Sequence, residues 1–156
     1  MLSAHEVLTN AELVNLGIAE CRDYSAGETI IVEGEQDRRV FLLEEGVARV
    51  TERVEIEGAK HIQPGLCDLA AGEIFGELGL FEPGPRSASV IAIEPCRVRV
   101  FDAEKLSAHF ETHPAHGYAV LKGLFSVLNQ RLRKADKRLG ALFAWGLKAH
   151  GIDEHL

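Results

Sequence analysis

Long apolar runs are absent from this 156-residue chain. A membrane-spanning helix needs about 18 or more consecutive apolar residues, and no stretch of the sequence reaches that length. The first six residues, MLSAHE, also lack the basic segment followed by an apolar one that marks a secretory signal peptide. We therefore expect no membrane segment and a cytoplasmic location.

Cysteine is scarce, and Cys21, Cys67 and Cys96 lie far apart. An odd number of cysteines without a Cys-x-x-Cys pair argues against a disulfide framework and against a cysteine-based metal cluster. We expect three reduced, buried thiols.

The motifs of common enzyme classes are missing as well. The sequence has no Gly-x-Ser-x-Gly, no Walker loop and no clustered Cys–His arrangement, so nothing marks a nucleophile or a base. His109 and His113 have the spacing of a zinc-binding pair on a helix, with His116 close by, but Pro114 interrupts the helix and no cysteine accompanies them. We predict surface histidines, no metal and no enzymatic activity.

Positive charge is outnumbered by negative charge. The 17 Lys and Arg residues face 24 Asp and Glu residues, which gives a net charge of −7. This balance argues against a broad nucleic-acid or anionic-membrane surface. The length suits one well-formed core with a helical appendage. We divide the chain into residues 1–112, an N-terminal helix plus a β-barrel, and residues 113–156, a long helix and tail of the same domain.

The first hundred residues combine one short helix with many short strands. Thr9 and Glu12 have the spacing of a capping box, which predicts a helix continuing through Leu16 to about Ala19 or Glu20. Apolar and β-branched runs separated by turn residues predict strands at 29–32, 39–43, 47–56, 87–93 and 97–101, with a hairpin turn at 57–60 and a return segment over 62–69. Strands at such short intervals indicate an antiparallel sandwich or barrel rather than βαβ units.

The last third of the chain is predicted to be helical. Asp102 can cap a short helix over residues 103–110, which His113 and Pro114 end. From residue 115 the apolar positions alternate spacings of four and three, as in a heptad repeat: Leu121, Phe125, Leu128, Leu132, Ala135, Leu139 and Leu142. This stripe could pack on the barrel, but because it continues beyond the barrel's expected reach we favour a homodimer through the helix over 115–142.

Residues 72–90 are the place to look for function. They hold a carboxylate, an arginine and closely spaced glycines between two apolar runs. Gly76 removes a side chain where the backbone would approach a ligand, and residues 77–81 can form one helical turn whose free N–H groups hold an anion. Arg86 offers a planar fork of donors for a phosphate, whereas Glu77 accepts hydrogen bonds from hydroxyls such as a ribose 2′-OH.

These residues resemble the phosphate-binding cassette of the cyclic nucleotide-binding domain family. The resemblance is carried by FGELGL at residues 75–80 and PRSASV at residues 85–90, with turn glycines at matching places from about Tyr24 onward. It implies that Glu77 holds the ribose 2′-OH, that Arg86 holds the cyclic phosphate, and that backbone N–H groups near Gly76, Leu78, Ser87 and Ala88 complete the site. The implied site residues are Phe75, Gly76, Glu77, Leu78, Gly79, Arg86, Ser87 and Ala88.

The resemblance also implies a fold and a function. The fold would be an antiparallel jelly-roll barrel (a double-stranded β-helix) with an N-terminal helix and a long C-terminal helix. The function would be non-catalytic binding of cAMP or cGMP, signalled by repositioning of the C-terminal helix, whose residues 131–138 would contact the base. Ala135 and Asp136 replace the threonine–serine pair found there in bacterial activators, and Ser87 does not discriminate between the two nucleotides. We favour cAMP because the overall likeness is to bacterial activators.

Three alternatives remain at this point. The chain could be a degenerate or cGMP-binding member that acts as a protein-interaction module. A cupin-like metal enzyme would share the barrel, but residues 24–101 hold only His61, too few ligands for its metal. A transcription regulator would need a DNA-binding module, and residues 139–156 are too few to form one. We therefore expect an unidentified effector protein as the partner.

Overall fold

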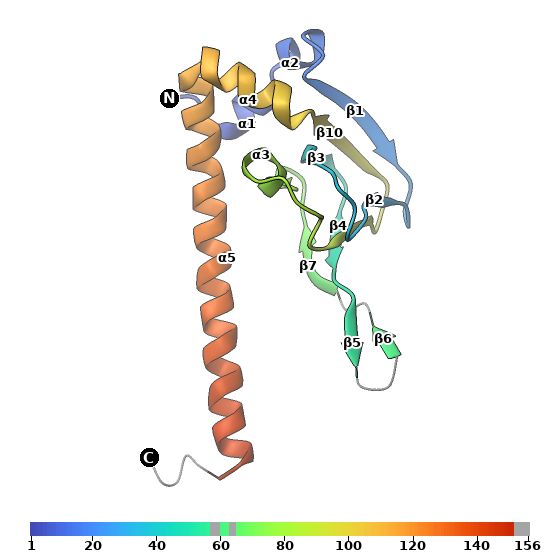
Figure 1. Cartoon of the computed structure of the whole chain (residues 1–156), viewed down its shortest axis with the longest axis vertical. Coiled ribbons are helices and arrows are strands. Elements are labelled where there is room, and N and C mark those ends of the chain that lie inside the picture. Colours follow the sequence, from blue (N-terminus) through green and yellow to red (C-terminus); the bar gives the residue numbers. More distant parts are fainter. Residues whose placement is uncertain (57–59, 63–64, 152–156) are drawn as a thin grey trace.

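The computed structural model describes residues 1–56, 60–62 and 65–151. Two antiparallel sheets face each other, helices cover one of them, and a long C-terminal helix runs along the side of the molecule and far beyond it (Figure 1). The predicted class, mainly β with flanking helices, is confirmed.

Each of the two sheets has four strands. The first sheet has the order β1 (Ala19–Tyr24), β10 (Cys96–Phe101), β3 (Val40–Glu45), β8 (Ile74–Phe75). The second has the order β2 (Thr29–Ile31), β9 (Ser89–Ala92), β4 (Ala48–Thr51), β7 (Gly65–Leu69). Strands distant in sequence, such as β1 and β10, are neighbours, as a jelly-roll connectivity requires.

The strand predicted over 47–56 is divided into β4 and β5 (Val54–Ile56), with Glu52 and Arg53 between them. β5 pairs antiparallel with β6 (Lys60–Ile62), so the predicted hairpin is present. Residues 57–59 of its predicted turn lie outside the described residues.

Strand β3 separates two apolar cores because both of its faces are buried. Val40 and Leu42 pack against the helices, whereas Phe41 and Leu43 face the other sheet. Side chains alternate between the two faces of a strand, so a strand buried on both sides is apolar throughout. The core between the sheets therefore backs directly onto the core beneath the helices.

The N-terminal helix prediction was wrong in its details. There are two short helices, α1 (Ala4–Leu8) and α2 (Ala11–Asn15), and the capping box belongs to Ser3 and Glu6. Asn10, not Thr9, caps α2, with its Oδ1 accepting a hydrogen bond from the Glu12 backbone N–H at 2.9 Å. The Thr9 hydroxyl instead donates to the carbonyl of His5 at 2.7 Å.

Strand β1 begins at Ala19, where the predicted helix was expected to end, and covers residues for which we predicted no strand. Ala19 is its only fully buried residue, and the exposed and half-buried positions that follow show no alternation. The strand forms because Ala19 to Tyr24 pair residue by residue with Phe101 to Cys96 of β10. Pairing between segments this far apart leaves no local signal in the sequence.

Three further helices complete the fold. The cassette contains a single turn, α3 (Leu78–Phe81). Helix α4 (Ala103–Thr112) starts at Asp102, whose side chain accepts from the backbone N–H groups of Glu104 and Lys105, so the predicted cap is confirmed. Helix α5 (Pro114–Ala149) begins at the predicted break and buries only Ala119, Val120 and Leu124, near its start, against the rest of the domain.

Within the part of the chain that the structure describes, none of the helices has both the length and the apolar composition needed to cross a membrane.

Candidate functional site

A cavity of about 360 Å³ lies beside α3, between the cassette and the second sheet. Its apolar wall comes from strands β2, β4, β7, β8 and β9: Ile31, Val50, Cys67, Leu69, Phe75 and Val90. All eight residues of the predicted site line this same cavity. Apart from Phe75, the apolar wall was not predicted, because it is assembled by pairing of strands that are distant in sequence.

The guanidinium group of Arg86 is buried at the base of the cassette. Its side chain is 8% exposed. One terminal nitrogen donates to the Gly76 carbonyl at 3.0 Å, and the other donates to the Arg39 carbonyl and lies 3.5 Å from Asp37 Oδ1. Its Nε is buried and has no hydrogen-bond partner among the described residues. A buried donor without a partner is costly, and an anionic ligand in the cavity would be its natural acceptor.

Position 76 requires a glycine because other groups of the protein approach its backbone too closely to leave room for a side chain. Its φ is +68°, and a Cβ there would lie 3.0 Å from the Phe41 ring and 3.1 Å from a terminal nitrogen of Arg86. We predicted that this glycine makes room for a ligand. In the structure the arginine that is predicted to hold the phosphate already packs against it, so any larger residue would displace that guanidinium.

Asp37 organises two arginines at the back of the site. Burial opposes the charge of Asp37, but hydrogen bonds from the side chain and backbone of Arg39, together with the positive charge of Arg86, hold the pKa of Asp37 below its usual value. Both arginines lie over the ring of Phe41, with Cζ 5.3 Å and 5.7 Å from its centroid. Sequence reasoning missed Asp37 and Arg39, and the turn that places them carried no functional signal.

Glu77 connects the cassette to the long helix. Its side chain is 9% exposed, and Oε1 accepts a hydrogen bond from a terminal nitrogen of Arg131 on α5 at 3.1 Å. Arg131 itself is 41% exposed and lines the cavity. A mostly buried carboxylate therefore meets a half-exposed arginine at the rim of the cavity. Movement of α5 would change the surroundings of Glu77 directly.

The rest of the predicted contact segment on α5 lies elsewhere. Of residues 131–138 only Arg131 lines the cavity. Ala135 and Asp136, which replace the pair found in bacterial activators, are exposed. Four residues correspond to about one turn of helix, so these positions lie one turn farther along α5 than Arg131.

The predictions for the cysteines were partly wrong. Cys96 is buried as expected, and burial raises the pKa of its thiol. Cys21 and Cys67 lie on β1 and β7 and are exposed, whereas Ala19 and Leu69 on the same two strands are buried. Exposure therefore varies along each strand, and no local pattern predicted it.

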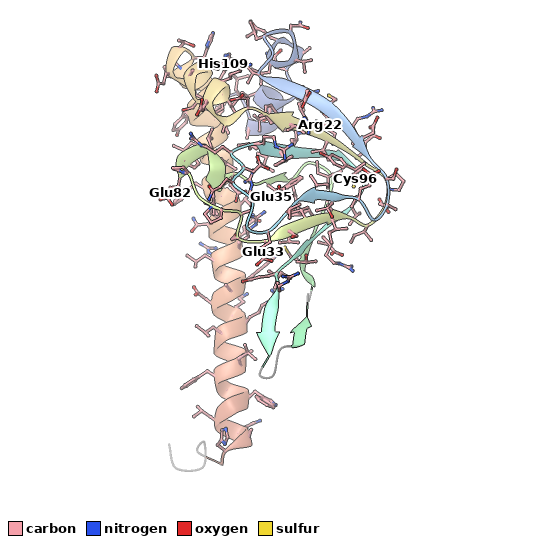
Figure 2. All side chains as sticks on the ribbon, turned by 45° about the vertical axis from the view of Figure 1, so that its right-hand side comes forward. Arg22, Glu33, Glu35, Glu82, Cys96 and His109 are labelled. Carbon is pink, nitrogen blue, oxygen red and sulfur yellow. The ribbon has the colours of Figure 1, made fainter. Side chains whose placement is uncertain are left out.

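The prediction of surface histidines was partly wrong: His113 is exposed and His116 is half-buried, but His109 is buried. His109 is 7% exposed, and its Nε2 lies 3.0 Å from Nδ1 of His116 across the junction between α4 and α5. The ring of His113 stacks on that of His109, with centroids 4.3 Å apart. His109 lies on α4, close to the start of α5 (Figure 2). Among the described residues no three potential ligands form a metal-binding group.

This histidine cluster predicts acid sensitivity of the α4–α5 junction. Burial, followed by the charges of His113 and His116, lowers the pKa of His109 from its usual 6.5. The unfolded chain therefore binds a proton more readily than the folded one, so stability is complete above about pH 6.5 and falls as the pH decreases below it.

We expect the melting temperature to fall between pH 7.5 and 5.5, and to fall less in His109→Gln. His150→Gln, near the end of α5, is the matched control and should behave like the wild type. Equal pH dependence in the wild type and His109→Gln would contradict this assignment.

Comparison with known proteins gives a consistent result. The family model described as "Cyclic nucleotide-binding domain" matches residues 21–113. The cyclic AMP receptor protein of Thermus thermophilus is 31% identical over 121 residues, which cover 78% of this chain and 52% of that protein. A CRP-like cAMP-activated global transcriptional regulator of Mycobacterium tuberculosis is 28% identical over 120 residues, covering 77% of this chain and 50% of that protein. The chain spans about half the length of these curated relatives.

A solved structure also resembles this chain over most of its length. The crystal structure of the Thermus thermophilus catabolite activator protein superimposes with a TM-score of 0.68 at 28% identity, over 90% of this chain and 63% of that one. The family model covers well over half of this chain and includes the whole cassette with Glu77 and Arg86. The chain therefore belongs to the cyclic nucleotide-binding domain family.

Proposed function

We propose that this chain is a cAMP-binding sensor in which the cavity beside α3 holds the nucleotide. Arg86 carries the proposal, since it is a buried arginine on the cavity wall whose Nε has no hydrogen-bond partner among the described residues. In the proposed complex Arg86 binds the cyclic phosphate and Glu77 accepts a hydrogen bond from the ribose 2′-OH. The purine packs against the apolar wall from β4 and β7.

Occupancy of the cavity is reported by α5 in this proposal. In the present structure Arg131 donates to Glu77, the carboxylate that the ribose is proposed to use. A bound ribose shares or replaces that contact and so favours a different placement of α5. Only the difference in nucleotide affinity between the two placements can drive the change; a micromolar dissociation constant corresponds to about 8 kcal/mol in total.

The choice of cAMP rests on the relatives. The Thermus and Mycobacterium proteins are described as a cyclic AMP receptor and as cAMP-activated. We extend that ligand to this chain, and we propose that the chain acts as a cytoplasmic regulator and not as an enzyme. cGMP is the second candidate, because the hydroxyl of Ser87 lines the cavity and could bind a guanine amino group as well as a phosphate.

Isothermal titration of the purified chain with cAMP, cGMP and linear 5′-AMP tests the ligand. We expect micromolar binding of cAMP, weaker binding of cGMP and at least tenfold weaker binding of 5′-AMP, whose phosphate has a different shape and charge. No heat and no thermal stabilisation at millimolar cAMP and cGMP would refute the proposal.

We also propose that α5 forms a parallel dimer with a second copy of this chain. The heptad residues Leu132, Leu139 and Leu142 are each at least 60% exposed, so the seam does not pack on the barrel. The buried face of α5, at Ala119, Val120 and Leu124, is a different one. An apolar stripe at heptad spacing that projects beyond its own domain suits a coiled-coil partner.

The dimer is tested by placing a charge in the seam. We expect the double variant Leu139→Glu, Leu142→Glu to be a monomer, because buried, unpaired carboxylates destabilise a coiled-coil core by several kcal/mol. Light scattering measures the molar mass of this variant and of the wild type, which we expect to be a dimer. Ala144→Glu is the matched control, since it introduces a glutamate on the outer side of the same helix and should leave the dimer intact. A wild-type monomer at 100 μM would contradict the proposal.

A further inference from the structure

Cys67 faces the nucleotide cavity from an edge strand. On β7, Cys67 and Leu69 line the cavity, whereas Asp68 between them points to the other face and accepts a hydrogen bond from Arg49 at 2.8 Å. Cys67 is opposite Val50 of β4, which also lines the cavity. Its thiol is exposed, so small molecules can reach it through the same space that a ligand would occupy.

The other two cysteines have different surroundings. Cys21 is exposed on β1 of the first sheet, where it pairs with Arg99 of β10, and it does not line the cavity. Cys96 is 3% exposed, and its thiol lies 3.3 Å from the carbonyl of Val47 (Figure 2). The chain therefore contains one thiol in the cavity, one exposed thiol outside it and one buried thiol.

We expect the cavity to hold one occupant at a time. Its volume of about 360 Å³ is near the lower end of the range for small-molecule sites, about 300–1,000 Å³. A tripeptide thiol attached to Cys67 would project into the space between the apolar wall and Arg86. Independently of the cysteine, the buried Nε of Arg86, which has no partner among the described residues, indicates that this space is built for a ligand.

We propose that modification of Cys67 and binding of a nucleotide in the cavity exclude each other. The modification is a mixed disulfide between Cys67 and a small thiol, and we call this arrangement a thiol gate. This inference rests on the proposed function. The reagent class is a low-molecular-weight disulfide such as glutathione disulfide. The Cys67 thiolate attacks one sulfur, a new S–S bond forms, the old one breaks, and the other half leaves as a thiolate that takes up a proton. A reducing thiol reverses the step.

The test treats the full-length chain with glutathione disulfide, with and without saturating cAMP, and measures modification of each cysteine by peptide mass spectrometry. We expect cAMP to slow modification of Cys67 at least tenfold and that of Cys21 less than twofold. We also expect the modified protein to bind cAMP at least tenfold more weakly and to recover after reduction.

Two variants assign the effect. Disulfide treatment should leave the cAMP affinity of Cys67→Ser at its own untreated value, whereas Cys21→Ser should lose affinity like the wild type. Two outcomes would refute the gate while leaving the proposed function intact, provided that the untreated protein binds cAMP. In the first, Cys67 reacts equally fast with and without cAMP. In the second, Cys67 resists the disulfide while Cys21 reacts. If untreated protein binds no cyclic nucleotide, both are refuted.

Discussion

Replacing Arg86 by alanine is expected to weaken cAMP binding by about 100-fold or more. In the proposed complex its guanidinium makes charge-assisted hydrogen bonds to the cyclic phosphate, each contributing about 1.5–3 kcal/mol, and a loss of about 2.8 kcal/mol corresponds to 100-fold. Isothermal titration of both proteins measures the change. Arg86→Lys keeps the charge but loses the planar fork, so we expect an intermediate affinity.

Arg86→Ala is also expected to lower the stability of the fold. Arg86 also binds the carbonyls of Gly76 and Arg39, and these acceptors lose their partner in Arg86→Ala. We therefore expect a stability loss of about 1–3 kcal/mol, seen as a lower melting temperature with an unchanged circular dichroism spectrum at 20 °C.

Arg49→Ala is the matched control for Arg86→Ala. Arg49 lies on β4 next to the cavity residue Val50, but it is exposed on the opposite face and pairs with Asp68. Its removal changes the net charge equally and should alter cAMP affinity less than twofold. Unchanged affinity in Arg86→Ala, or an equal loss in Arg49→Ala, would contradict the role given to Arg86.

The cassette could be predicted from the sequence because its polar residues lie within one short segment. Glu77 and Arg86 are nine positions apart, and the glycines and prolines around them mark the turns of the segment locally. The groups behind them could not be predicted. Asp37 and the cavity face of β7 reach the site only through pairing of distant strands, and no local pattern specifies which strands pair.

Local patterns also failed where two similar signals competed. Ser3 with Glu6, and Thr9 with Glu12, both have capping-box spacing, but only the first pair forms one. Asn10, next to Thr9, caps α2 instead, since a short side chain can accept from the first-turn N–H groups just as well. The exposure of Cys21 and Cys67 also depends on how the sheets are assembled, because Ala19 and Leu69 on the same strands are buried.

Gly46→Ala is expected to cause the largest loss of stability, about 3 kcal/mol or more. Gly46 joins β3 to β4 with φ +96°, and a Cβ there would lie 2.4 Å from the carbonyl oxygen of Pro95 and 2.9 Å from Sγ of Cys96. Both contacts are closer than van der Waals distance and involve the start of β10, which lies between β1 and β3 in the first sheet. The strained backbone adds about 1–3 kcal/mol to the steric cost.

Gly34→Ala separates these two costs. Gly34 also has positive φ, +84°, but a Cβ there would have nothing within 4 Å. It should therefore show only the backbone strain, with a melting temperature about 2–12 °C below that of the wild type, whereas Gly46→Ala should lose at least twice as much. Thermal unfolding followed by circular dichroism measures both. Equal losses in the two variants would mean that the contact of Gly46 with Pro95 and Cys96 contributes nothing, and that the turn between β3 and β4 can move away from β10 without cost.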